Sequence, residues 1–276
     1  MTFTYQRSYR GKLQAAIFDW AGTVLDFGCL APAVTFIEGF RREGIDITVG
    51  EAREPMGAHK RVHIEKITQM APVRERWIAK HGKAPSDADV ERMYQAFIPL
   101  QIECLSNYST LIPGALDTIA KLRARGCKIG ATTGYSTEMT AVNLKDAARQ
   151  GYKPDHSVSA TEVPAGRPFP HMCLENVIHL GVSTVEACVK IDDTRPGIEE
   201  GLSAGMWTIG VAISGNEVGL SLADWEKLSE AERAPRRAIA TERLAQSGAH
   251  YVVDSIADIM PCIDDFEVRL ARGEKP

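Results

Sequence analysis

Residues 13–23 read LQAAIFDWAGT, a short apolar run that ends in the acid Asp19 and a turn-prone Ala-Gly-Thr segment. A continuous apolar run of this length predicts a parallel β-strand, because such strands are buried on both faces of their sheet. Similar apolar runs recur along the chain, at residues 127–133, 187–191, 207–213 and 251–253.

Helical patterns alternate with these apolar runs, at residues 114–125, 137–150, 171–180 and 197–204. This alternation predicts the α/β class, with a doubly wound parallel sheet and crossover connections. Residues 215–248 are polar, which predicts a loop followed by a surface helix. Open α/β sheets bind ligands beyond the carboxyl ends of their strands, so polar residues directly after each strand are the candidate site residues.

One stretch, residues 29–106, interrupts the alternation, because it shows helical periodicity and no convincing strand. One amphipathic helix is expected there with Val34, Ile37 and Phe40 turned inward. Helices are predicted in this stretch at residues 32–44, 56–70 and 87–104.

The interruption predicts two domains. Residues 1–28 and 107–276 would form the α/β core, and residues 29–106 a helical cap inserted after the first strand. A domain inserted at this point would lie over the carboxyl ends of the strands.

Composition excludes several classes of protein. The 276 residues carry a net charge of -4 with a pI near 6.0 and no Lys/Arg-rich block, so no nucleic-acid partner is expected. No apolar stretch reaches 18 residues and the first residues lack an apolar signal segment, so neither a membrane span nor secretion is expected. The six cysteines form no zinc-binding pattern, and a reducing, cytoplasmic setting is predicted.

Chemically useful side chains follow the predicted strands. Asp19 offers a carboxylate nucleophile, Thr133 a hydroxyl, Arg167 a cation, and the adjacent Asp192 and Asp193 a pair of metal ligands. This set suits phosphoryl transfer, in which positioning and charge stabilisation do most of the catalysis. Mg²⁺ favours carboxylates together with phosphate oxygens, so a magnesium site is predicted here.

Each of these residues also has a simpler structural explanation. Asp19 could be a turn residue, Thr133 a solvated hydroxyl at a strand end, and Arg167 a surface charge. Asp192 and Asp193 could cap the helix that follows them, since aspartate is favoured at that position.

The order of the motifs resembles that of the haloacid dehalogenase superfamily. By this resemblance Asp19 is the nucleophile, Thr133 and Arg167 bind the transferred group, and Asp192 and Asp193 hold Mg²⁺. Phosphatases of the superfamily usually place a second Asp two residues after the nucleophile, where it protonates the departing alkoxide. Ala21 occupies that position and offers only its backbone carbonyl, as a metal ligand. Either activity is impaired or the leaving group needs no such acid.

The predicted helix at residues 56–70 offers a resolution. Met56, Lys60, His63 and Ile67 are spaced by four, three and four residues and would share one face. A desolvated lysine can attack an aldehyde, and the resulting iminium accepts the electrons of a breaking carbon–phosphorus bond. Lys60 and His63 could equally belong to a solvated helix face.

The segment Glu54-Pro55-Met56-Gly57 followed by Lys60 and His63 resembles the cap motif of the phosphonoacetaldehyde hydrolase family. Cys29, Thr133-Gly134-Tyr135 and the GRPFP segment at residues 166–170 fit the same family. The resemblance implies hydrolysis of phosphonoacetaldehyde to acetaldehyde and phosphate, with Lys60 as the Schiff-base lysine and His63 assisting proton transfer. It places the following residues in or near the substrate pocket: Cys29, Met56, Gly57, Thr133, Gly134, Tyr135 and Arg167. It also implies a homodimer, and we expect the helix at residues 32–44 to form the contact.

Two alternatives remain open. A phosphate-ester phosphatase or phosphomutase of the same superfamily would share the motifs, although Ala21 argues against both. A non-catalytic binding protein on the same fold would not need Asp19, Arg167 and the acidic pair intact.

Overall fold

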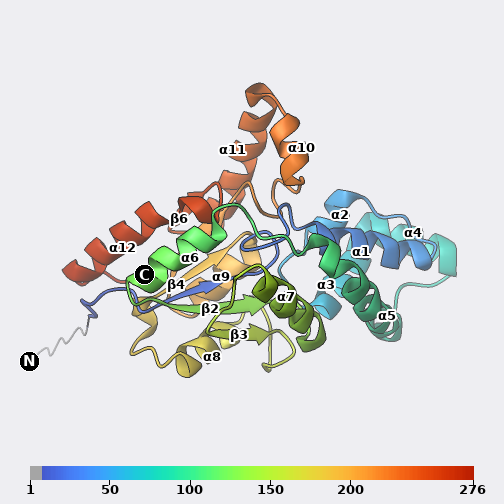
Figure 1. The fold of residues 1–276 in the computed structure, drawn as a ribbon. Helices are drawn as coiled ribbons and strands as arrows, with labels where there is room; N and C mark the ends of the chain where they lie inside the picture. Colours follow the sequence, from blue (N-terminus) through green and yellow to red (C-terminus); the bar gives the residue numbers. More distant parts are fainter. Residues whose placement is uncertain (1–7) are drawn as a thin grey trace, which may run out of the picture.

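The computed structural model describes residues 8–276, and a sheet of six parallel strands forms its centre (Figure 1). The strands lie in the order β3-β2-β1-β4-β5-β6. Their bounds are Ala15–Phe18 (β1), Lys128–Thr133 (β2), His156–Ser159 (β3), Cys188–Asp192 (β4), Trp207–Val211 (β5) and Tyr251–Val253 (β6). The predicted doubly wound parallel sheet is therefore confirmed. The first strand lies in the middle, between β2 and β4.

The sequence patterns did not predict one of the strands, β3. β3 has the sequence HSVS and contributes a single apolar side chain, Val158, to the core. It lies at the edge of the sheet beside β2, where His156 and Ser157 are partly exposed. An edge strand of this kind lacks the continuous apolar run on which the prediction of parallel strands relies.

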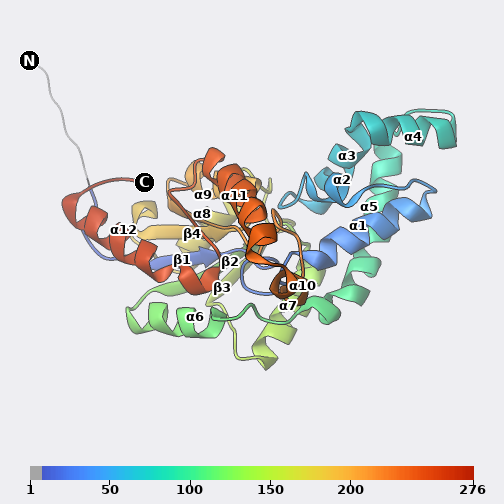
Figure 2. The ribbon, with the colours of Figure 1, turned by 90° about the horizontal axis from the view of Figure 1, so that it is seen from above.

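Helices cover both faces of the sheet (Figure 2). Alternate side chains of β1 show the division, because Ala16 and Phe18 enter one core cluster while Ala15 and Ile17 enter another. One face carries α6 (Ala115–Ala124), α7 (Thr137–Arg149) and α12 (Met260–Arg272), and the other carries α8 (His171–His179), α9 (Arg195–Ser203) and α11 (Glu230–Gln246). The predicted polar segment at residues 215–248 contains α10 (Leu222–Lys227) as well as α11.

Six α-helices lie between β1 and β2 in the sequence, and the first five of them gather beyond the carboxyl ends of the strands (Figures 1 and 2). These five are α1 (Leu30–Arg42), α2 (Val49–Arg53), α3 (Lys60–Gln69), α4 (Ala71–His81) and α5 (Asp87–Leu105). Phe36 of α1 stacks on Phe97 of α5 with ring centroids 4.5 Å apart. The patterns did not reveal α2 and α4 as separate helices.

Two details predicted for these helices are wrong. The buried face of α1 carries Ala33, Phe36 and Phe40, whereas Val34 is 40% exposed, because the face is set by the aromatic contact with α5. Met56 does not share the face of α3, since it lies in a turn before the helix. Gly57 has a φ of +91°, which interrupts the helical backbone between Met56 and Lys60.

Two linkers join the inserted helices to the sheet, and they pair with each other. The amide of Asp26 donates to the carbonyl of Thr110 at 3.1 Å, and that of Ile112 donates to Val24 at 2.8 Å. The Asp26 carboxylate then accepts hydrogen bonds from the first amides of α1. Residues 1–7 of the predicted core segment 1–28 lie outside the described residues. Within residues 8–276, no helix is both long and apolar enough to span a membrane.

Candidate active site

Three adjacent strands deliver the candidate residues to one edge of the sheet. Asp19 directly follows β1, Thr133 ends β2, and Asp192 ends β4 with Asp193 next to it. Because β1 is hydrogen-bonded to both β2 and β4, the three strand ends meet at this edge. Arg167 reaches it from the segment that follows β3.

A small cavity of about 20 Å³ lies between this edge and the inserted helices. The predicted site residues that line it are Asp19, Ala21, Cys29, Met56, Gly57, Lys60, Thr133, Gly134, Tyr135, Arg167 and Asp193. Pro32 and Thr194 also line it and were not predicted. A volume of this size accommodates roughly one water molecule, so the structure describes a closed arrangement.

Glycines permit this close approach between the inserted segment and the sheet. A Cβ on Gly57 would lie 2.3 Å from the hydroxyl oxygen of Thr194, and a Cβ on Gly134 would lie 2.6 Å from the carbonyl oxygen of Ala58. The two backbones could not lie this close if either position carried a side chain.

Arg167 lies among three buried carboxylates. Its Nη2 lies 2.6 Å from Oδ1 of Asp19 and 3.2 Å from Oδ2 of Asp192, and its Nε donates to Glu200 at 3.0 Å. Although burial opposes the charge, these carboxylates hold the pKa of Arg167 well above its ordinary value. The guanidinium is therefore a fixed cation beside Asp19.

A second buried cation, Lys190, binds the residues around Arg167. Lys190 of β4 donates to Asp192 at 2.7 Å and to the Thr132 hydroxyl at 2.9 Å, and it lies 3.7 Å from Glu200. The sequence patterns assigned no role to Lys190, Glu200 or Thr132. A signal for Lys190 existed, because a lysine inside an apolar strand needs a buried partner, and Asp192, two residues on, shares its face.

Carboxylate oxygens of Asp19, Asp192 and Asp193 all lie within 4.8 Å of one another. Burial, together with the charges of the other two aspartates, raises the pKa of Asp193 well above its usual range. Burial likewise raises the pKa of Asp19 to about 6, although Arg167 opposes the shift. Such a cluster fits a divalent cation, which would offset the repulsion between the carboxylates.

The two acids of the pair differ in their remaining hydrogen-bonding capacity. Asp192 accepts from the amide and hydroxyl of Thr194 through Oδ1 and from Lys190 through Oδ2, which also forms an ion pair with Arg167. Burial opposes ionisation of Asp192, but Arg167 and Lys190 outweigh it and hold its pKa below the ordinary value. Asp193 accepts one strong bond, from the amide of Asn216 at 2.7 Å.

Asp192 and Asp193 do not cap the helix that follows them, which was the simpler explanation of this pair. Thr194 is the N-cap of α9, and its hydroxyl accepts from the amide of Gly197. Gly22 and Gly215 enclose the Asp193 side chain so closely that a Cβ on either would lie 2.3 Å or less from an Asp193 side-chain atom.

Lys60 is the first residue of α3 and is 3% exposed. Its Nζ lies 4.8 Å from the ring centre of Tyr135 and 5.5 Å from that of Phe36. Burial lowers the pKa of Lys60 to about 8, although the charge of Asp19 opposes the shift. A substantial share of this amine is therefore neutral, and hence nucleophilic, at slightly alkaline pH.

His63 lies one helical turn from Lys60 but does not line the cavity. Its Nε2 lies 2.8 Å from the carbonyl oxygen of Ala52, and its ring stacks on Phe36 with centroids 3.8 Å apart. Burial, reinforced by the charge of Lys60, holds the pKa of His63 well below its ordinary value. The neutral ring must donate from Nε2 to the carbonyl, which leaves Nδ1 as an acceptor.

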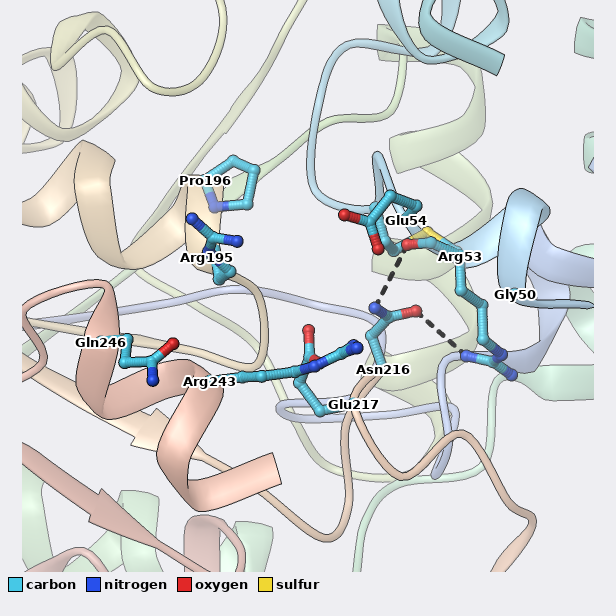
Figure 3. Close-up of a pocket in the computed structure, with 10 residues that line it drawn as sticks. Gly50, Arg53, Glu54, Arg195, Pro196, Asn216, Glu217, Arg243 and Gln246 are labelled. Carbon is cyan, nitrogen blue, oxygen red and sulfur yellow. Dashed lines mark hydrogen bonds and ion pairs between the residues drawn. The ribbon is translucent and has the colours of Figure 1, made fainter. Parts of the chain in front are cut away.

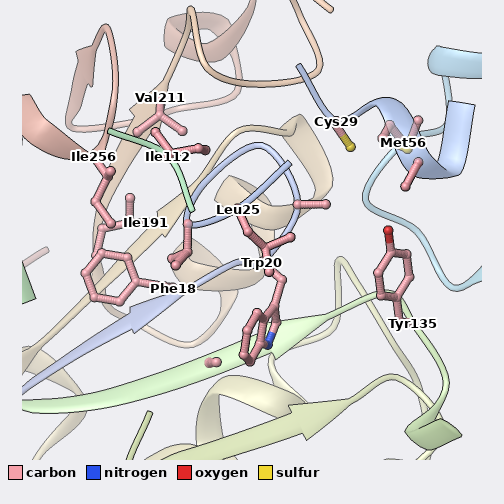
Figure 4. Close-up of a cluster of buried hydrophobic side chains, with 14 of the residues drawn as sticks. Phe18, Trp20, Leu25, Cys29, Met56, Ile112, Tyr135, Ile191, Val211 and Ile256 are labelled. Carbon is pink, nitrogen blue, oxygen red and sulfur yellow. The ribbon is translucent and has the colours of Figure 1, made fainter. Parts of the chain in front are cut away.

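Tyr135 and Cys29 complete the apolar side of the cavity. Figure 4 shows the Tyr135 hydroxyl pointing toward Cys29 and Met56, which line the same cavity. Among the described residues this hydroxyl has no hydrogen-bond partner, although it is buried. Burial raises the pKa of both Tyr135 and Cys29 well above their ordinary values, so both groups remain protonated.

Comparison with known proteins agrees with this fold. A model of the haloacid dehalogenase-like hydrolases matches residues 13–205, and the chain belongs to that family. Within it, the chain belongs with the phosphonoacetaldehyde hydrolases. It is 51% identical over 276 residues to the phosphonoacetaldehyde hydrolase of Hahella chejuensis, covering 100% of this chain and 94% of that protein. It is 49% identical over 267 residues to the phosphonoacetaldehyde hydrolase of Klebsiella pneumoniae, covering 96% of this chain and 99% of that protein.

Solved structures give the same result. A phosphonoacetaldehyde hydrolase-like protein from Oleispira antarctica has a TM-score of 0.98 at 47% identity, with 100% of both chains covered. The β-phosphoglucomutase of Clostridium difficile has a TM-score of 0.65 at 18% identity, with 93% of this chain and 98% of that chain covered. The second likeness shows that the two proteins share a fold.

Proposed function

We propose that this enzyme hydrolyses the carbon–phosphorus bond of phosphonoacetaldehyde, with Lys60 forming an imine and Asp19 accepting the phosphoryl group. One observation carries the proposal: a buried lysine with a lowered pKa lines the same small cavity as the carboxylate Asp19. The names of the relatives at 45–51% identity support the substrate.

The chemistry follows from these two groups. The neutral amine of Lys60 adds to the aldehyde carbon, loss of water gives an imine, and a proton taken up from solvent converts the imine to an iminium. A carboxylate oxygen of Asp19 attacks phosphorus, and the electron pair of the carbon–phosphorus bond moves into the new carbon–carbon double bond of an enamine. Water then releases phosphate from Asp19. Protonation of the enamine carbon and hydrolysis of the imine release acetaldehyde and restore Lys60.

Proton transfers need a neutral base near Lys60. We assign this part to His63, whose Nδ1 is free to accept because Nε2 donates to Ala52. Arg167 would hold the phosphonate, since its Nη1 makes only a long contact of 3.5 Å, with the carbonyl of Gly57. Thr133, Gly134 and Tyr135 would line the rest of the substrate site.

We assign the metal to Mg²⁺, held by Asp19, Asp193 and the backbone carbonyl of Ala21. Asp192 would support the site indirectly, because its two oxygens already accept hydrogen bonds from Thr194 and Lys190 and one of them forms an ion pair with Arg167. When bound, Mg²⁺ neutralises the repulsion between Asp19 and the incoming phosphonate dianion.

Removal of the metal is expected to abolish turnover. EDTA should stop acetaldehyde release, and added Mg²⁺ should restore it, because the buried carboxylates otherwise repel the anionic substrate. Coupled measurement of acetaldehyde with and without chelator checks this. Full activity in rigorously metal-free buffer would rule out the assignment.

The missing acid at Ala21 predicts substrate preference. Ordinary phosphate monoesters should have a kcat/KM at least ~10²-fold lower than phosphonoacetaldehyde, the lower end of the contribution of one general acid. Phosphate release from a phosphonoaldehyde, a phosphate monoester and a sugar phosphate tests this prediction and separates the phosphatase and phosphomutase alternatives. Release from none of the three would favour a binding protein, and equal rates on the first two would contradict the prediction.

We also infer a cap domain of residues 29–106 on a core of residues 1–28 and 107–276, and a homodimer formed through α1. The exposed Val34 supports an α1 contact, because it leaves an apolar side chain on the outer face of that helix. Light scattering measures the mass in solution, and a monomer at micromolar concentration would refute the dimer.

A further inference from the structure

Among the described residues, Arg53, the last residue of α2, makes all its side-chain hydrogen bonds with segments outside the inserted helices or at their junction. Figure 3 shows its contacts with Asn216. Its Nη1 donates to the carbonyls of Gly28 at 2.9 Å and Cys29 at 3.3 Å, and to the side-chain oxygen of Asn216 at 3.1 Å. Its Nη2 donates to the carbonyl of Gly219 at 3.1 Å. One guanidinium thus joins α2, the first linker and the loop after β5.

The loop after β5 leads directly to the acidic cluster. The amide of Asn216 donates to Oδ2 of Asp193 at 2.7 Å, and its side-chain amide donates back to the carbonyl of Arg53 at 3.4 Å. Asn216 is 7% exposed, so this contact is shielded from solvent. Gly219 has a φ of +66°, and a Cβ there would lie 2.8 Å from the guanidinium carbon, so a glycine is needed for the approach.

The first linker is bound to the same loop. The amide of Gly28 donates to the carbonyl of Ser214 at 2.7 Å, and the Ser214 hydroxyl donates to the carbonyl of Gly22 at 2.8 Å. Gly22 in turn packs against the Asp193 carboxylate. Two routes therefore run from Arg53 to Asp193, one through Asn216 and one through the linker.

The closed arrangement around Lys60 must open to admit the substrate. The cavity at Asp19 and Lys60 has a volume of about 20 Å³, which cannot hold a substrate of seven non-hydrogen atoms. The segment bearing Met56 and Lys60 must therefore move away to admit it. Arg53 lies three residues before Met56, at a cavity of about 430 Å³ between the inserted helices and the core.

We infer that Arg53 is a positioning residue that couples closure of the Lys60 segment to the orientation of Asp193. In the closed state its charge-assisted bonds hold α2, the linker and the Asn216 loop together. When the segment moves away, Asn216 and Gly219 lose their hydrogen bonds from Arg53. The backbone amide of Asn216, which orients Asp193, is then held less firmly. This inference rests on the proposed function, but its first two readouts below require no substrate.

The test compares Arg53→Ala with Arg76→Ala. Arg76 of α4 is a matched control, because it also binds α2, through Glu51, and its other hydrogen bonds among the described residues go to the carbonyls of Asp46 and Pro72 rather than to the core. Amide hydrogen exchange in the metal-free proteins should rise about ten-fold at residues 49–60 and 214–219 in Arg53→Ala. In Arg76→Ala, amide hydrogen exchange should rise only within the inserted helices.

Two further readouts follow from the coupling. Mg²⁺ binding measured by calorimetry should weaken about ten-fold in Arg53→Ala, the usual effect of losing a partner that orients a metal ligand, and should not change in Arg76→Ala. kcat/KM should fall at least about ten-fold in Arg53→Ala alone, since small misplacements at a reacting centre are costly. Arg53→Lys, which keeps the charge and most of the side chain, should retain intermediate Mg²⁺ affinity.

Unchanged exchange at residues 214–219 in Arg53→Ala would overturn the inference, as would Mg²⁺ affinity equal to that of Arg76→Ala. If Arg53→Ala proves too unstable to measure, Arg53→Lys decides: wild-type exchange and wild-type Mg²⁺ affinity in that variant would also overturn it. If exchange and Mg²⁺ affinity change as expected while phosphonoacetaldehyde is not turned over, the proposed function fails and the coupling stands.

Discussion

Replacing Lys60 by arginine is expected to lower kcat/KM for carbon–phosphorus cleavage at least about 10³-fold, which corresponds to about 4 kcal/mol of transition-state stabilisation. Arginine keeps a positive charge beside Tyr135 and Phe36, but its guanidinium cannot form an imine. Without the iminium, a carbanion would have to leave phosphorus. Coupled assay of acetaldehyde release measures the loss.

The control for this variant is Lys66→Arg on the same helix. Lys66 is exposed on α3, so the substitution should leave kcat/KM within a factor of about two. Thermal unfolding should show both variants folded. Near-normal turnover by Lys60→Arg would mean that the mechanism or the choice of lysine is wrong.

Replacing Asp19 by asparagine is expected to reduce phosphate release at least about 10³-fold, because an amide oxygen cannot replace a carboxylate as the nucleophile at phosphorus. The shape of the side chain is retained, so Arg167 and the backbone after β1 should stay in place. The exposed Asp117 of α6, changed to asparagine, provides the control and should leave activity unaltered.

The Asp19→Asn variant also separates the two halves of the reaction. Lys60 should still form an imine in it, since the aldehyde end of the substrate does not involve Asp19. Rapid-quench measurement of bound phosphorus should find no aspartyl-phosphate. Wild-type phosphate release by this variant would contradict the assignment of the nucleophile.

Much of the fold could be predicted from the sequence because the central strands are buried on both faces. Continuous apolar runs at β1, β2, β4 and β5 reveal such strands. The edge strand β3 has no such run, and the inward face of α1 depends on which partner packs against it. Phe36 rather than Val34 points inward because Phe97 lies opposite, and the α1 sequence alone does not specify that partner.

The candidate site was predictable where residues follow strands and less so where distant segments meet. Asp19, Thr133 and Asp193 come directly from neighbouring strand ends. Glu200 and Arg53 act through partners far along the chain, Arg167 and Asn216, and no local spacing indicates these contacts. The approach of Gly57 to Thr194 likewise depends on how the inserted helices lie over the sheet.

The central claim is a covalent imine on Lys60, and reductive trapping tests it most directly. Borohydride added together with phosphonoacetaldehyde should inactivate the enzyme and leave a reduced secondary amine on Lys60, detected by peptide mass spectrometry. Borohydride alone should leave activity intact. The rate of trapping should rise as the pH increases through about 8, where burial places the pKa of this amine. An adduct on Lys66, or complete resistance to borohydride in the presence of substrate, would contradict the account.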